Sequence, residues 1–211
     1  MNGRSLLMSC LLASAVCAAQ STPSPNSLSA AEKAEGYELL FDGKSFTAFD
    51  PASDTAKVWS IVDGALKSDS TKGAGRLATK EEYANFVLKA EFMSDPRVHA
   101  HVWLRSGRPR GGYELQIKDY DPKNTSDGSI TGSITRVGHA PPGTTIQPGV
   151  WNTLEVTMDG PHLTVIYNGK KTVDVNDSSF ASGPISIALA TPEDAPGEDI
   201  AFRNLKIKRR P

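Results

Sequence analysis

The sequence predicts an all-β protein, an antiparallel jelly-roll β-sandwich with little helix. From residue 37 onward, short segments in which apolar and polar residues alternate follow one another, and a period of two is typical of half-buried strands. Turn dipeptides such as Asp63-Gly64 and Asn168-Gly169 separate these segments. Because no helical crossovers lie between them, we expect neighbouring strands to pair antiparallel. A chain of this length favours two packed sheets over one open sheet.

The first nineteen residues, MNGRSLLMSCLLASAVCAA, have the pattern of a secretory signal peptide. Arg4 precedes an apolar run, and small residues provide an expected cleavage site near Ala18-Ala19. We therefore expect a secreted protein, periplasmic or extracellular, without a membrane span. Both cysteines, Cys10 and Cys17, lie in this segment, so the mature protein would have no disulfide. A lipoprotein anchor is the alternative, although the apolar run before Cys10 is very short and a branched residue precedes Cys17.

Residues 20–35 are expected to form a tether followed by a short helix. The part up to Leu28 is rich in Ser and Pro, which is typical of a flexible linker. Ser29 and Glu32 have the spacing of a capping box, and Gly36 would end the helix after two turns.

The sandwich domain is expected to occupy residues 36–210, without an internal repeat or a second domain. Its expected strands are, in chain order, WSIV, ALKS, NFVLKAEFM, HAHVWLR, GYELQIKDY, WNTLEVTM, HLTVIY, KTVDV, PISIALA and IAFRNLKIK. WSIV and ALKS flank Asp63-Gly64, and HLTVIY and KTVDV flank Asn168-Gly169. The second pair is a strong hairpin signal, because a two-residue primed turn needs positive φ at both positions.

Composition and charge argue against several classes of function. The 211 residues are 38% hydrophobic and 22% charged, an ordinary mixture for a soluble globular domain. Without the signal segment, which contains Arg4, 22 basic residues stand against 24 acidic ones. This balance argues against binding to nucleic acid or to an anionic membrane surface. The sequence contains no nucleophile elbow and no phosphate-binding glycine loop, and it does not indicate an oligomeric state.

The strands HAHVWLR and GYELQIKDY are expected to form a hairpin with one polar face, since only SGRPRG separates them. Residues of one parity on the two strands would share this face; they are His99, His101, Trp103, Arg105, Glu114, Gln116 and Lys118. Trp is costly to leave on a solvated surface, and an indole beside Arg, Glu and Gln suits a sugar. The pattern therefore indicates a carbohydrate-binding surface. A polar face without a function is the alternative, in which Arg105 and Glu114 form an exposed ion pair worth under about 1 kcal/mol.

Other candidate sites have weaker patterns. The pair His99 and His101 could bind a metal, but no third ligand lies nearby in the sequence. Segment 119–129 offers oxygen ligands for calcium yet lacks the spacing of a calcium-binding loop, so a surface turn is favoured. His139 lies on a Pro-rich loop that could hold a catalytic side chain, and a structural role is equally expected. The acidic segment 191–199 is expected to be a solvated loop.

Several of these stretches together resemble the 3-keto-disaccharide hydrolase domain family. The matching stretches are AEKAEGYELLFDGKSFTAF, WSIVDGAL, GRLATKEEYANFVLKAEF, VWLRSG, GYELQIKDY, APPG, WNTLEVTMDGPHLTVIYNGKKTVDV, GPISIAL and FRNLKIK, in the order and spacing of that family. They run through residues 30–209. The resemblance implies a concanavalin A- or laminin G-like sandwich in a periplasmic or extracellular setting. It also implies, for characterised relatives, cleavage of 3-keto-glycosides.

The reaction that the resemblance implies is an elimination followed by hydration. A ketone at C3 acidifies the C2 proton, a base removes that proton, the anomeric group leaves, and water adds to the resulting enone. This chemistry needs a base near C2, a group that stabilises the enolate oxygen, and an acid or a metal for the leaving oxygen. Oxidation and reduction belong to partner enzymes, so the step needs no nicotinamide.

The resemblance also implies roles for particular residues. Arg105 would bind the ketone or enolate oxygen, and Glu114 and Gln116 would bind the sugar, with Glu114 a candidate base. His139 could act as base or acid. Asp119 would lie at the end of its strand, where it could be near a divalent metal. No other cofactor is expected. The remaining residues of the expected substrate surface are Trp103, His101 and Lys118.

The chain also departs from the family pattern, and three functions therefore remain open. VHAH replaces the usual NSG before the VWLR strand, Phe49 stands where Trp is common, and the segment ATPEDAPGED lacks a His. The first function is a 3-keto-glycoside hydrolase or lyase; the second is a non-catalytic carbohydrate-binding module of the same fold. The third is a cell-surface scaffold or protein-binding module. A conventional glycosidase is disfavoured, since the polar face offers one clear carboxylate and that chemistry requires two.

Overall fold

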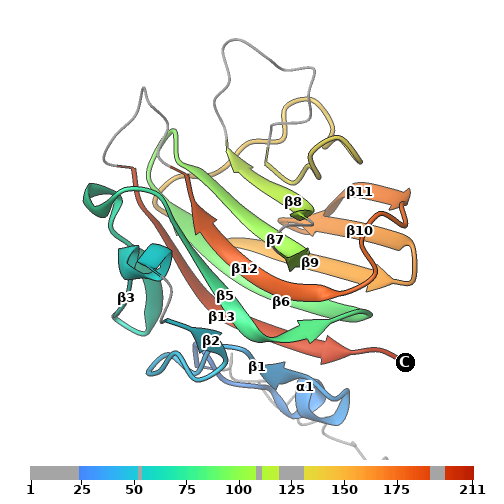
Figure 1. Cartoon of the computed structure of the whole chain (residues 1–211), viewed down its shortest axis with the longest axis horizontal. Coiled ribbons are helices and arrows are strands. Elements are labelled where there is room, and N and C mark those ends of the chain that lie inside the picture. Colours follow the sequence, from blue (N-terminus) through green and yellow to red (C-terminus); the bar gives the residue numbers. More distant parts are fainter. Residues whose placement is uncertain (1–23, 52–53, 108–110, 119–130, 191–197) are drawn as a thin grey trace, which may run out of the picture.

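Two antiparallel sheets packed against each other form the domain in a computed structural model (Figure 1). The structure describes residues 24–51, 54–107, 111–118, 131–190 and 198–211. The predicted antiparallel β-sandwich is confirmed. The signal segment, both cysteines and Asp119 lie outside the described residues, and so does the turn between the strands of the predicted hairpin. Within those ranges, no helix has the length and apolarity needed to cross a membrane.

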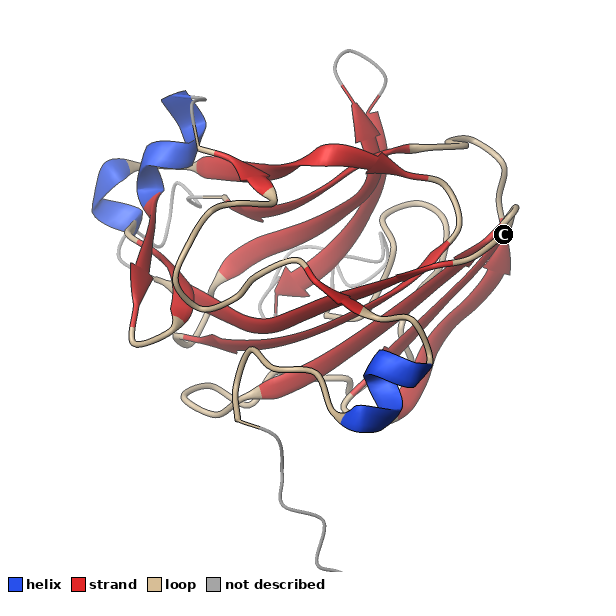
Figure 2. Ribbon diagram, turned by 90° about the horizontal axis from the view of Figure 1, so that it is seen from below, coloured by secondary structure: helices blue, strands red, loops and turns tan. Residues whose placement is uncertain are grey.

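The strands divide into an eight-stranded and a five-stranded sheet among the described residues. We call the larger one sheet A; in spatial order it contains β11 (Lys170–Asn176), β10 (His162–Tyr167), β9 (Asn152–Asp159), β6 (Phe86–Ser94), β13 (Ile200–Arg209), β4 (Ala65–Ser68) and β3 (Trp59–Val62), with β1 (Glu38–Leu39) also paired to β13. Sheet B contains, in spatial order, β2 (Phe49–Asp50), β5 (Gly75–Tyr83), β12 (Gly183–Leu189), β7 (His99–Gly107) and β8 (Gly111–Lys118). The helical segments are α1 (Ala30–Ala34) and the 3₁₀ turns η1 (Asp54–Val58) and η2 (Ser70–Lys72). Figure 2 shows these segments at the periphery of the strand layers.

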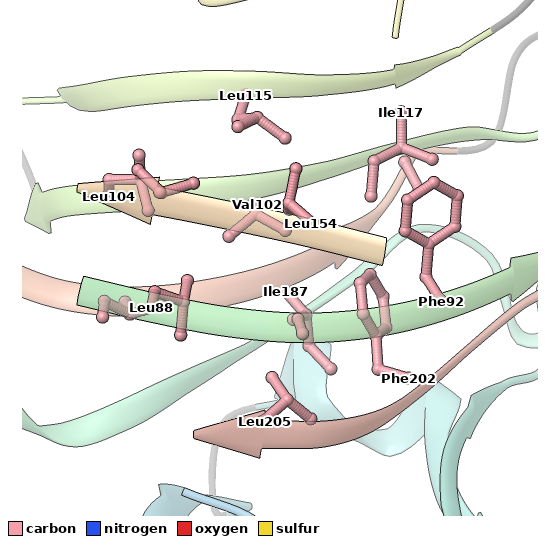
Figure 3. Packing of buried hydrophobic residues seen from close by; sticks show 14 of the residues in the cluster. Leu88, Phe92, Val102, Leu104, Leu115, Ile117, Leu154, Ile187, Phe202 and Leu205 are labelled. Atoms are coloured by element: carbon pink, nitrogen blue, oxygen red, sulfur yellow. The ribbon is translucent and has the colours of Figure 1, made fainter. Parts of the chain in front are cut away.

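The inner faces of the two sheets supply the core (Figure 3). Leu88 and Phe92 of sheet A and Val102 and Leu104 of sheet B are at most 1% exposed. Each such side chain contributes about 1.5–3 kcal/mol of stabilisation by leaving water. In β8, Tyr113, Leu115 and Ile117 are also at most 1% exposed. The intervening residues of β8 must therefore point away from the core, because successive side chains of a strand alternate between its faces.

The hairpin turn and the helix cap predicted from local sequence signals are both confirmed. Asn168 and Gly169 have φ values of 45° and 77°, and they connect β10 to β11 as the primed hairpin turn predicted for them. The capping box is also present: the Glu32 amide donates to Ser29 Oγ at 3.1 Å, and the Ser29 amide donates to Glu32 Oε2 at 2.9 Å. All ten predicted strands are found.

Strand β5 was not predicted, although it lies between β2 and β12 in sheet B. Its residues 80–82 are Lys-Glu-Glu and all three are exposed, so the alternation that identifies a strand is lost over its second half. This omission matters for the site, because β5 supplies a charged side chain to the surface described below.

The described end of the predicted tether is fastened to the sandwich rather than free. Asn26 Nδ2 donates to the Gly64 carbonyl at 2.7 Å, and the Asn26 amide donates to Asn204 Oδ1 at 2.6 Å. In return, the Asn204 amide donates to Asn26 Oδ1 at 2.8 Å. Asn26 therefore attaches this part of the expected linker to the turn between β3 and β4 and to β13.

Candidate functional site

The outward side of β7 and β8 carries most of the predicted polar face. The two strands pair antiparallel, as expected, and the cross-strand neighbours are His99 with Lys118, His101 with Gln116, and Trp103 with Glu114. All six side chains lie opposite the core residues of these strands. We call this surface, with its continuation on β12 and β5, the polar face.

Small side chains of β12 separate the polar face into two sides. Ser186 and Ala188 pair with Trp103 and His101 of β7. On the other side of β12, Ala188 pairs with Arg76 of β5. The bulky polar groups of β7 and β8 and the guanidinium of β5 thus flank a strip of small residues.

Segment 131–135 runs along the free edge of β8 and shelters the polar face from water. The Gln116 amide donates to the Ser133 carbonyl at 2.9 Å, and the Thr135 amide donates to the Glu114 carbonyl at 3.0 Å. Gln116 Nε2 also donates to Thr135 Oγ1 at 2.6 Å. Gln116 and His101 are only 4% and 7% exposed. The other four side chains of β7 and β8 on this face are partly exposed, so the polar face has a buried centre and an accessible margin.

His101 lies at the centre of this cluster. Its Nε2 is 3.1 Å from His99 Nε2 and 3.3 Å from Glu114 Oε1. Burial lowers the pKa of His101 to about 4; the nearby Gln116 amide opposes this shift, and the positive charges of Lys118 and Arg76 add to it. Gln116 Oε1 is buried next to the imidazole without a hydrogen bond of good geometry among the described residues. With its pKa at about 4, His101 is uncharged at neutral pH, so its 3.3 Å contact with Glu114 is not an ion pair.

Arg76 reaches across β12 to the indole of Trp103. Its Cζ lies 5.0 Å from the centre of the Trp103 ring system, within the range of a cation–π contact. Its Nε donates to Ser186 Oγ at 2.8 Å. The indole also meets the His101 ring edge-on, with 6.2 Å between ring centroids. Arg76 was not among the predicted site residues, because β5 was not predicted; the alternation of Arg76 with the buried Leu77 is the signal that could have revealed it.

Arg105 does not lie on the polar face, which corrects the parity prediction. A register shift occurs between Leu104 and Gly107, and Arg105 has a φ of 46°. This bulge turns the side chain toward the end of the sandwich. Its guanidinium donates to the carbonyls of Ala84, Gly160 and Phe180 at 2.7, 2.8 and 3.0 Å and to Asn85 Oδ1 at 3.3 Å. The residue is 3% exposed, and burial lowers its pKa. Arg105 therefore joins the turns that follow β5 and β9.

The remaining predicted residues are spread out. His139 is exposed, and within the described residues no hydrogen bond or ion pair connects it with the polar face. Asp119 and segment 119–129 belong to the part that the structure does not describe beyond Lys118, so their roles stay predictions. In the acidic segment, Glu198 pairs with Arg97 at 3.4 Å, while residues 191–197 are outside the described ranges. The described side chains include no group of three His, Cys, Asp or Glu that could hold a metal ion, and a metal site stays a prediction.

Comparison with known proteins agrees with this architecture. The model of the 3-keto-alpha-glucoside-1,2-lyase-like domain family matches residues 36–208. A "putative glycosyl hydrolase" from Parabacteroides distasonis ATCC 8503 superposes with a TM-score of 0.76 at 22% identity, covering 89% of this chain and 100% of that one. The carbohydrate-binding module CBM66 from Bacillus subtilis gives a TM-score of 0.53 at 14% identity, covering 70% of this chain and 89% of that one. A Bacillus subtilis protein with a galectin-like fold gives 0.52 at 12% identity, with 76% and 94% covered. No curated protein matches the sequence. The structural similarities establish the fold, and the family match supports a function in carbohydrate chemistry.

Proposed function

This chain belongs to the 3-keto-alpha-glucoside-1,2-lyase-like domain family, and we propose that it cleaves 3-keto-glycosides at the polar face by elimination and hydration. The family resemblance noted in the sequence is confirmed by the match over residues 36–208. The observation that supports the proposal most is a carboxylate, Glu114, held beside a buried neutral imidazole on a sheltered face.

Glu114 is suited to be the base that removes the C2 proton. Its side chain is 22% exposed, so a bound sugar can reach it, while its Oε1 contacts His101 Nε2 at 3.3 Å. Because His101 is neutral at pH 7, it can position the carboxylate without the positive charge that would lower its basicity. An accessible carboxylate with a neutral neighbour supports a role as general base.

The reaction balances without an external oxidant or reductant. Glu114 takes the proton from C2, and the C–H electron pair forms the C2–C3 double bond while the carbonyl pair moves to O3. The enolate then reforms the ketone, the C1–C2 double bond forms, and the bond from C1 to the aglycone oxygen breaks. The aglycone oxygen takes a proton from water and Glu114 returns its proton to the solvent; the sugar product is a 2-hydroxy-3-keto-glycal. Addition of water at C1 and C2 gives the free 3-keto sugar.

The setting of this reaction is part of the proposal. The signal-like N-terminal segment supports a location outside the cytoplasm. Enzymes that oxidise the C3 hydroxyl would then supply the substrate, and enzymes that reduce the ketone would consume the product.

A non-catalytic carbohydrate-binding module is the second candidate. The similarity in fold to a carbohydrate-binding module and the presence of Trp103 on the polar face favour it. In that case the same cluster would bind a sugar and leave the glycosidic bond intact.

Incubation of the purified protein with 3-keto-trehalose or a 3-keto-glucoside separates the two functions. The proposal predicts release of aldose or a 2-hydroxyglycal from the ketone substrate and no action on the parent glucoside. The variant Glu114→Gln should lose turnover by about 10²–10⁴-fold. Glu38→Gln, a change at an exposed carboxylate of β1 in sheet A, is the matched control and should keep full activity. Binding of the sugar without product would establish the module instead.

A further inference from the structure

The proposed elimination needs a positively charged group near the C3 oxygen of the sugar. Arg105 cannot supply it, because its side chain does not lie on the polar face. Its guanidinium is committed to three backbone carbonyls away from the polar face. Among the described residues, Arg76 and Lys118 are the basic side chains whose charge acts on His101. These two are therefore the candidates for the cation.

Arg76 is the better placed of the two relative to the base. It stands over Trp103, 5.0 Å from the ring system, and Trp103 pairs directly with Glu114 across β7 and β8. Side chains of such a pair have Cβ atoms about 4.5–5.5 Å apart. The guanidinium and the carboxylate residue are therefore both neighbours of one indole. Lys118 pairs with His99 instead. It lies four residues along β8 from Glu114, which is about 13 Å along the strand.

A hydrogen bond and an aromatic contact hold the side chain of Arg76. Ser186 Oγ accepts from Nε at 2.8 Å, and the indole of Trp103 lies beneath Cζ. Ser186 itself is 0% exposed and also lies 3.3 Å from Ser106 Oγ. A long side chain held at two points loses little further freedom when a ligand binds, so the group is preorganised.

The intermediate matches a planar guanidinium better than the substrate does. In the substrate, C2 is tetrahedral and its hydroxyl leaves the plane of the C3 carbonyl. After loss of the C2 proton, C2, C3 and both their oxygens lie in one plane, with negative charge on O3. Arginine presents donors in a flat fork that binds two coplanar oxygens at once. Such contacts strengthen as the proton leaves, which is what accelerates the step.

We propose that Arg76 binds the C3 and C2 oxygens of the 3-keto sugar and stabilises the enediolate that forms when Glu114 removes the C2 proton. This assignment rests on the proposed function and deepens it by naming the substrate class. The substrate must be a ketone with an adjacent free hydroxyl at C2. A 3-keto-glucoside methylated on O2 should be a poor substrate even though its ketone is unchanged.

Steady-state kinetics of variants at Arg76 and at two lysines, measured on a 3-keto-glucoside, test the assignment. Arg76→Met should lower kcat by about 10²–10³-fold, the usual loss for one group at an oxyanion, with a smaller change in KM. Arg76→Lys keeps the charge but not the fork and should recover only part of that loss, and added guanidinium ion should partly rescue Arg76→Ala. Lys118→Met removes the other candidate cation and should lower kcat much less than Arg76→Met does. Lys67→Met, at an exposed position of β4 in sheet A, is the matched control and should stay within about threefold of the unchanged protein. Thermal unfolding of each variant checks that it is folded.

Calorimetric binding of the 3-keto-glucoside and its parent glucoside keeps the assignment testable if no turnover is seen. Preference for the ketone that disappears in Arg76→Met would support Arg76 as the ketone-binding group while overturning the proposed catalysis. Equal binding of both sugars, no binding of either, or a ketone preference that Arg76→Met retains would overturn the assignment. So would an unchanged kcat in Arg76→Met, or an equal loss in Lys118→Met.

Discussion

Replacement of Arg105 with methionine is expected to destabilise the fold rather than to remove a catalytic group. The guanidinium is 3% exposed and donates four hydrogen bonds, three of them to carbonyls of separate turns. Methionine fills much of the same volume but offers no donor, so buried carbonyls lose their partners. Hydrogen bonds to a charged group contribute about 1.5–3 kcal/mol each, and the desolvation of the guanidinium offsets part of the sum. We expect a net loss of about 3–5 kcal/mol, at the upper end of what a single substitution that breaks a buried hydrogen-bond network costs.

Urea unfolding followed by circular dichroism measures this loss, and thermal unfolding should show a midpoint lower by about 10 °C. Lys67→Met, at an exposed position of β4 in sheet A, is the control and should change stability by about 0.5 kcal/mol or less. Below its unfolding transition, Arg105→Met should retain most of its turnover. A variant as stable as the unchanged protein but without turnover would refute this reasoning and return Arg105 to the catalytic role implied by the family resemblance.

Two further changes test the packing of the polar face and its supports. In the folded state the pKa of His101 falls to about 4 from its usual value of about 6.5. Between these values the unfolded chain binds a proton that the folded protein does not. The free energy of unfolding should therefore be constant above pH 6.5 and decrease by about 3 kcal/mol as the pH falls toward 4. His101→Gln should remove most of this pH dependence, which urea unfolding of both proteins at pH 7 and pH 4.5 measures. An equal change in the free energy of unfolding between these pH values in both proteins would contradict a buried neutral imidazole. Gly183→Ala should cost about 1–3 kcal/mol, because a Cβ there would lie 2.6 Å from backbone atoms of Arg105 and Ser106. An alanine variant with unchanged unfolding would show that the bulge does not pack as described.

The parts of the fold that depend on local patterns could be predicted from the sequence. Alternation in GYELQIKDY identified which side chains of β8 enter the core, because burial of Tyr113, Leu115 and Ile117 leaves only one orientation for the strand. The Asn168-Gly169 turn was also identified, since few dipeptides tolerate positive φ twice.

The errors arose where the chain leaves the regular period. A bulge adds a residue without any change in composition, so parity placed Arg105 beside Trp103 while the backbone turns it away. Gly112 and Gly183 pack closely against the bulge. A Cβ atom at either position would lie 2.7 Å or less from a backbone atom of the bulged segment. No pattern in a single sequence links these distant glycines to Arg105. Arg76 was not predicted for a related reason: the charged residues in the second half of β5 interrupt the alternation that its first half shows.

The fate of the C2 hydrogen tests the central claim most directly. When the protein cleaves a 3-keto-glucoside in D₂O, early samples of the released sugar should carry deuterium at C2, as read by NMR or mass spectrometry, and Glu114→Gln should release almost none. Released 3-keto sugar incubated alone provides the correction for spontaneous exchange. Cleavage that leaves the original hydrogen on C2 would contradict removal of that proton by the carboxylate of β8.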